Sequence, residues 1–279
     1  MAFQVIFRRE LRDTVLSRRF LIYLALILLP VVVGAGFSYA VHRDPSTLTT
    51  MTSMLPEPIT QVTPAICMMI YMDIATLSVV LVAILHSADF IAGEQARGTL
   101  QLLVSKPVRR WQIILGKYSS FLVIFIPLIF ASVALMSLSL PLMGIGPVSL
   151  NVFLGYFAYL FAMGIVYISL ATLFSAIARR TLTAVLATFI LMIVWIMFDF
   201  IIIYLPESIA NVLNNFSLSF YANNILGYIS GGTAALFVVG GVPSQVLLSD
   251  YLQSWGVIFA LLVLPVIVAM LVLQQRDIL

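Results

Sequence analysis

The chain has 279 residues, of which 62% are hydrophobic and only 9% are charged. A soluble globular domain carries about 25% charged residues, so this composition excludes one and indicates that lipid surrounds most of the chain. The net charge of +3 does not indicate nucleic-acid binding, because the Lys and Arg residues lie at the ends of apolar runs. We therefore predict an all-α integral membrane protein.

Residues 1–19 are predicted to form an N-terminal helix that lies in the membrane interface. Its apolar residues recur every fourth position, and its arginines gather on another side: Phe3, Phe7, Leu11 and Val15 against Arg8, Arg9, Arg12 and Arg19. Glu10 and Arg18 interrupt the apolar face. The alternative is a charged flank that only precedes the first membrane span.

Six apolar runs follow, and each is long enough to cross a hydrocarbon core of about 30 Å at about 1.5 Å per residue. Residues 205–250 contain Gly231-Gly232 and Gly240-Gly241, which interrupt helices, so we predict an outer re-entrant region there. A seventh span within this region is the alternative. We predict a single transmembrane domain, 1–279, with spans at about 20–41, 64–86, 118–141, 149–178, 182–204 and 252–275.

The basic residues predict the orientation of these spans. If the N-terminus is cytoplasmic, every Lys and Arg except Arg43 falls on the cytoplasmic side. The opposite orientation would leave only that arginine inside. By the positive-inside rule we predict a multi-pass protein of the plasma (cytoplasmic) membrane with both termini in the cytoplasm.

The cytoplasmic segment 87–117 is predicted to be structured. Asp89, Glu94 and Arg97 suit a short helix that breaks at Gly98. Thr99 is placed to cap a second short helix, which carries Leu100, Leu102 and Leu103 and stops at Pro107. A short apolar helix in water needs a partner to cover it. The alternative is a loop that packs on its own helix ends or on lipid headgroups.

The pattern of residues in this segment resembles that of a transporter family. The string runs Asp89-x-x-x-x-Glu94-x-x-x-Gly98-Thr99-Leu100-x-Leu102-Leu103-x-Ser105-x-Pro107-Val108-x-Arg110, followed by Gly116-Lys117. It is similar to the signature of type 2 ATP-binding cassette (ABC) exporter permeases, a group that includes multicopper-enzyme maturation permeases. One departure is Ala96, where the family often has a second acidic residue. If that acid pairs with the ATPase, Glu94 or Asp89 must replace it here.

The resemblance implies that the segment contains a coupling helix, which transmits movement from a separate ABC ATPase subunit. It implies two permeases, identical or different, with two ATPase subunits, and ATP and Mg on the partner. The ATPase-docking residues would be Asp89, Glu94, Arg97, Gly98, Thr99, Leu100, Leu102, Leu103, Pro107 and Arg109. The chain has no G-x-x-x-x-G-K-[ST] phosphate loop, so we predict no catalytic residue and no bound cofactor.

Asp73 lies inside the second span, where carboxylates are costly and commonly functional. It is a candidate for the substrate path, with a hydrogen bond between helices as the alternative. Asp73 also supports a second hypothesis, a secondary transporter coupled to an ion gradient, against which the absence of an inverted repeat counts. An intramembrane enzyme is a third hypothesis without any H-E-x-x-H or G-x-S-x-G motif.

No metal site is predicted. Cys67, Met68 and Met72 carry soft ligands that suit Cu(I), but Met is also a common filler of apolar helices. His86 and Asp89 are three residues apart, and two ligands alone are thin evidence for a metal. The sequence does not select a substrate.

Overall fold

The structure, a computed structural model, describes residues 2–46, 62–98, 110–232 and 246–275. Over these ranges the chain is helical and contains no strand. The helices are α1 (Ala2–Val15), α2 (Arg18–Arg43), α4 (Pro64–Ser87), α5 (Ala92–Ala96), α7 (Arg110–Leu142), α8 (Leu150–Ile177), α9 (Thr181–Ile203), α10 (Glu207–Leu213), the 3-10 turn η1 (Asn214–Phe216), α11 (Leu218–Ser230) and α12 (Leu248–Gln275).

Six of these helices, α2, α4, α7, α8, α9 and α12, are long and apolar enough to cross a membrane. They coincide with the six predicted apolar runs, and five of them begin within four residues of the predicted start. The exception is α7, which begins at Arg110 instead of 118. Its added turns bury Ile113 and Ile114, so apolar packing continues the helix beyond the run that hydropathy detects.

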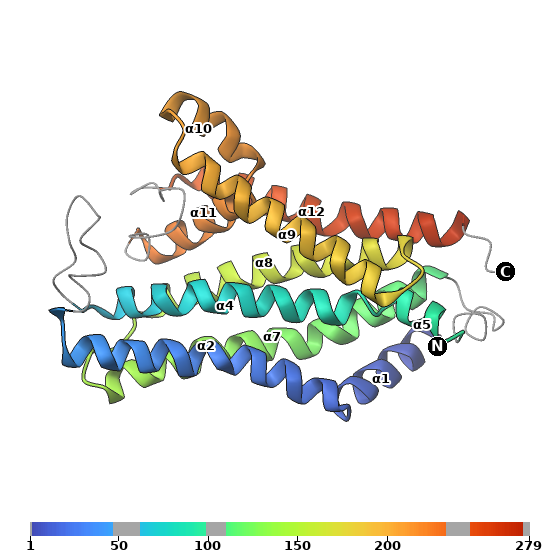
Figure 1. The fold of residues 1–279 in the computed structure, drawn as a ribbon, viewed down its shortest axis with the longest axis horizontal. Coiled ribbons are helices and arrows are strands. Elements are labelled where there is room, and N and C mark those ends of the chain that lie inside the picture. The colour runs from blue at the N-terminus through green and yellow to red at the C-terminus, as the bar shows by residue number, and fades with distance from the viewer. Residues whose placement is uncertain (1, 47–61, 99–109, 233–245, 276–279) are drawn as a thin grey trace.

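Helix α8 is the centre of the bundle. It contacts α4, α7, α9, α11 and α12. In its most apolar stretch of 18 residues, 72% are buried. Helix α9 lies at the edge, and only 17% of the corresponding stretch of α9 is buried. Figure 1 shows α9 crossing the bundle obliquely, whereas α2, α4 and α7 run beside one another.

Small and polar residues hold the central helices together. A Cβ atom at Gly164 of α8 would lie 2.5 Å from Cε1 of Phe125 on α7 and 3.2 Å from Cγ1 of Val79 on α4. Tyr71 of α4 hydrogen-bonds Ser132 of α7 at 2.7 Å, and the Ser132 hydroxyl donates to the carbonyl of Ile27 on α2 at 3.0 Å. The core therefore combines close helix approach with buried hydrogen bonds, as membrane bundles commonly do.

The N-terminal helix α1 is separate from the first span. It ends at Val15, and Ser17 adopts an extended conformation that starts α2 at Arg18. The predicted boundary at 19 is therefore wrong by several residues, because Arg18 and Arg19 occupy the first turn of α2. Helix α1 packs on the start of α7, where a Cβ at Gly116 would lie 2.9 Å from Cγ2 of Ile6.

The region predicted as re-entrant contains short helices where the structure describes it. Helix α10 and the turn η1 follow α9, and α11 packs on α8 and α12. Helix α11 ends at Gly231, whose φ of 66° is left-handed and favours glycine. No seventh long apolar helix occurs in the described parts of the chain, and residues 233–245 lie outside them.

We predict that Gly164→Ala lowers the thermal stability of the purified protein. The added methyl group overlaps the buried Phe125 ring, and overpacking of this kind costs about 1–3 kcal/mol. The matched control is Gly36→Ala, because a Cβ there meets nothing within 4 Å. Thermal unfolding of both variants in the same detergent tests this. Equal melting temperatures would show that α8 is not held at this contact.

Candidate functional site

Two arrangements of polar residues are candidates for function, at different places along the bundle. The first lies at the end of the bundle where α1, α5 and the starts of α2, α7 and α9 meet, which we call the basic end (Figure 1). The second lines a cavity between α4, α8 and α9.

Asp89 is the first centre of the basic end. It follows α4, and its carboxylate accepts hydrogen bonds from Arg19 of α2 at 2.6 Å, from Arg97 at 2.9 Å and from Thr181 of α9 at 3.0 Å. Only 18% of the Asp89 side chain is exposed. One carboxylate thus connects the segment after α4 to the first turns of two other helices.

The charge of Asp89 is stabilised by these neighbours. Burial alone would raise the pKa of this carboxyl, but the hydrogen bond from Arg19, the charge of Arg97 and the hydrogen bond from Thr181 outweigh it and hold the pKa below its ordinary value. A lowered folded-state pKa gives stability that is present above the unfolded-state value. That stability is lost as the pH falls through the folded-state value.

Lys117 is the second centre of the basic end. Its ammonium group lies 2.9 Å from Glu10 of α1 and 3.1 Å from Glu94 of α5, and its side chain is only 6% exposed. A buried ammonium group is costly unless it is paired and hydrogen-bonded. Lys117 therefore holds α1 and α5 to the start of α7.

The backbone between these two centres is also fixed. The Ser175 hydroxyl of α8 accepts hydrogen bonds from the backbone N–H groups of Ile91 and Ala92, each at 3.0 Å, and donates to the carbonyl of Ala88 at 2.8 Å. A Cβ at Gly93 would overlap the Asp89 carboxylate, so the close turn requires glycine. The segment 88–97 is consequently attached to α2, α7, α8 and α9.

The structure places four of the predicted docking residues. Asp89, Glu94 and Arg97 take part in these contacts within the chain, and Gly98 ends the turn after α5 with a φ of 69°. The others, Thr99, Leu100, Leu102, Leu103, Pro107 and Arg109, lie outside the described residues.

Sequence reasoning did not anticipate several partners of the basic end. Lys117 was noted only as a basic residue after a glycine, and Ser175 and Thr181 were not singled out. Spacing carries no signal for these residues, because their partners are distant in sequence. The position of Lys117, directly before the predicted span at 118, is the one sequence feature from which a paired charge could have been expected, because lysines are seldom buried unless they are paired.

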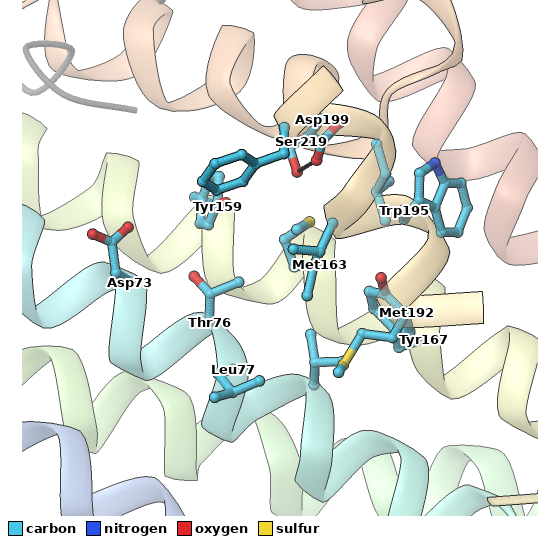
Figure 2. A pocket seen from close by; sticks show the side chains of 14 residues that line it. Asp73, Thr76, Leu77, Tyr159, Met163, Tyr167, Met192, Trp195, Asp199 and Ser219 are labelled. Carbon is cyan, nitrogen blue, oxygen red and sulfur yellow. Dashed lines mark hydrogen bonds between the residues drawn. The ribbon is translucent and has the colours of Figure 1, made fainter. Parts of the chain in front are cut away.

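Asp73 contributes to the second arrangement, a cavity of about 240 Å³ between α4, α8 and α9. Figure 2 shows it projecting from α4, with Tyr159 and Met163 of α8 nearby in the view. Across the cavity, Asp199 of α9 accepts hydrogen bonds from Ser217 and Ser219 at 2.6 Å each. The rest of the lining is mostly apolar and aromatic: Thr76, Leu77, Val80, Tyr167, Met192, Trp195, Ile196, Phe200 and Leu218.

The other candidate ligands are packed in the apolar core. Cys67, Met68 and Met72 are buried among the central helices. His86 stacks on Phe121 with ring centroids 4.0 Å apart, and its Nδ1 lies 3.3 Å from the Tyr23 hydroxyl. Within the described ranges, no group of three or more His, Cys, Asp or Glu side chains is placed to hold a metal ion.

Comparison with known families gives the class of the protein. Residues 4–278 match the family described as ABC-2 family transporter protein, which is nearly the whole chain. The chain belongs to this ABC-2 family. A search of the curated proteins finds no matching relative.

Membership has direct consequences for the predictions. The protein is a multi-pass membrane protein and the transmembrane subunit of an ABC transporter. Permeases of this family pair with an ABC ATPase subunit and are membrane components without ATPase activity of their own. The resemblance detected in segment 87–117 is thus confirmed at the level of the ABC-2 permeases.

We predict that Lys117→Met destabilises the permease by about 2 kcal/mol, because it removes the ammonium group that pairs with the partly buried carboxylates of Glu10 and Glu94. The double variant Lys117→Met/Glu94→Gln should recover part of this loss. The control is Arg9→Gln, whose ion pair with Asp13 is exposed on both sides and contributes under about 1 kcal/mol. Thermal unfolding of all three tests the claim, which fails if Arg9→Gln and Lys117→Met are equally stable.

Proposed function

We propose that the permease moves a substrate across the membrane when a separate ATPase subunit binds and hydrolyses ATP, and that segment 87–117 receives the movement. The observation that carries this proposal is the attachment of residues 88–97 to four spans. Arg19 of α2, Lys117 of α7, Ser175 of α8 and Thr181 of α9 all contact this one short segment.

Such a segment is suited to transmit a rigid-body displacement. Charge-assisted hydrogen bonds are short and strong, and those of Asp89 are 2.6 and 2.9 Å long. Lys117 extends the connection to Glu10 of α1. A push on the segment would therefore move the ends of several helices together.

We propose that the charged and the apolar residues of the segment have different roles. Asp89, Glu94 and Arg97 pair inside the chain, which favours an anchoring role for their charges. The apolar residues Leu100, Leu102 and Leu103, with Arg109 and the stop at Pro107, would then supply the surface that enters the ATPase. Apolar burial gives such an interface its affinity, and charge at its rim gives orientation.

This proposal places the basic end in the cytoplasm and both termini with it, as the positive-inside rule predicts. Helix α1 would lie in the interface, with the exposed Arg8, Arg9 and Arg12 available to anionic headgroups. The short helices α10 and α11 would form the outer re-entrant region. Two permeases would act with two ATPase subunits, which bind ATP and Mg. A role among the multicopper-enzyme maturation permeases stays a prediction from the motif.

We expect the double variant Leu102→Asp/Leu103→Asp to lose ATP-driven transport by at least tenfold, because two carboxylates cannot enter an apolar groove. The measurements are co-purification of the ATPase from native membranes and ATP-driven transport in proteoliposomes. The matched control is Leu247→Asp/Leu248→Asp, two adjacent exposed leucines at the far end of the bundle from α5.

The outcomes separate the competing functions. If no ATPase with a phosphate loop co-purifies and the Leu102/Leu103 variant transports normally, the coupling proposal is wrong. If the purified permease alone transports under a proton or sodium gradient, the secondary transporter driven through Asp73 replaces it.

A further inference from the structure

The cavity between α4, α8 and α9 combines features that recognise one class of ligand. We propose that it binds an apolar organic cation, which would be the substrate or a competitor of the substrate. This inference rests on the proposed transport function and adds the chemistry of what is transported.

The first observation is the sign of the charges that face the cavity. Asp73 of α4 and Asp199 of α9 both line it, and no Lys, Arg or His is among its described lining residues. Figure 2 shows the two carboxylates on different helices, Asp73 on α4 and Asp199 on α9, with that of Asp199 turned toward Ser219. Two negative groups with no basic residue beside them favour a cation and repel an anion.

The second observation is that Asp73 has no hydrogen-bond or ion-pair partner within the part of the chain that the structure describes. It lies nine residues after Pro64, about 14 Å along α4 at about 1.5 Å per residue, which is well inside a membrane span. Carboxylates at such depth face a cavity or a partner and commonly mark a substrate or ion path. Asp199 differs, because Ser217 and Ser219 already hydrogen-bond it.

The third observation is the apolar and aromatic character of the remaining wall. Tyr159 and Tyr167 of α8 and Trp195 of α9 present aromatic rings, and Met163 and Met192 present thioethers. Aromatic rings attract cations at their faces, and Trp does so most strongly. Methionine adapts to apolar bodies of varied shape.

These features exclude other ligand classes. A polysaccharide chain of many sugar rings is too large for this cavity, whose volume is about 240 Å³. A small hydrated metal ion would gain nothing from the aromatic and thioether wall, and the described residues offer no third carboxylate, His or Cys near Asp73 and Asp199.

The test uses two ions of the same shape and opposite charge, tetraphenylphosphonium and tetraphenylborate. The purified permease in lipid nanodiscs is titrated with each, with empty nanodiscs as the blank and no ATPase or ATP present. We expect saturable binding of tetraphenylphosphonium and none of tetraphenylborate.

Asp73→Asn should lower the affinity for the cation at least tenfold, and Trp195→Leu should lower it severalfold. The matched control Asp250→Asn removes one carboxylate outside the cavity and should bind as the unaltered permease does.

Equal binding of the two ions, or unchanged cation affinity in Asp73→Asn, would overturn the proposal. Because Asp73 makes no hydrogen bond to the described residues, Asp73→Asn should keep the thermal stability of the unaltered permease. If Asp73→Asn is less stable, two other variants decide the question. Asp73→Glu should retain cation binding, and Trp195→Leu should weaken it severalfold. The binding measurement needs no nucleotide, so its failure leaves the ATP-coupling proposal standing, and failure of ATP coupling leaves the binding result intact.

Discussion

The pairing of Lys117 with Glu10 and Glu94 is the constraint on which the basic end depends. An ammonium group that is only 6% exposed must be matched by negative charge, and here the two carboxylates come from two helices, α1 and α5. This pairing fixes where α1 lies, since α1 packs against the start of α7 beside Gly116. It also fixes α5, and through α5 it positions Asp89 between Arg19, Arg97 and Thr181.

The rest of the bundle is held by forces of another kind. Around α8 the helices approach closely at Gly164 and share buried hydroxyl hydrogen bonds, such as the 3.0 Å contact between Tyr118 and Ser169. In lipid, apolar side chains gain little by leaving their solvent, so close packing and buried hydrogen bonds carry more of the association. The bundle therefore has a tightly packed centre, an ionic end and a cavity at the edge, under α9.

The sequence predicted the spans well and the ionic end poorly, for physical reasons. A membrane span needs about 20 apolar residues whatever it packs against, so the six long helices follow from composition alone. The charges at the basic end obey no such local rule. Glu94 and Asp89 were expected to face a partner, and the structure pairs them with Lys117 and Arg19 from distant parts of the chain. Asp73 was recognised because a carboxylate inside an apolar run is conspicuous. Its shared cavity with Asp199 required the packing of α9 against α4 and α8.

Helix α9 connects the two candidate sites. Thr181, in its first turn, hydrogen-bonds Asp89, and Trp195 and Asp199, several turns later, line the cavity. Within this chain only 17% of the most apolar stretch of α9 is buried, against 72% for α8, so fewer contacts inside the chain oppose its displacement. A helix attached to the anchored segment at one end and forming a cavity wall toward the other is the element whose movement would change the cavity when the segment moves. Under the proposed coupling, the ionic end would supply the rigidity, α8 the fixed reference, and α9 the wall that moves.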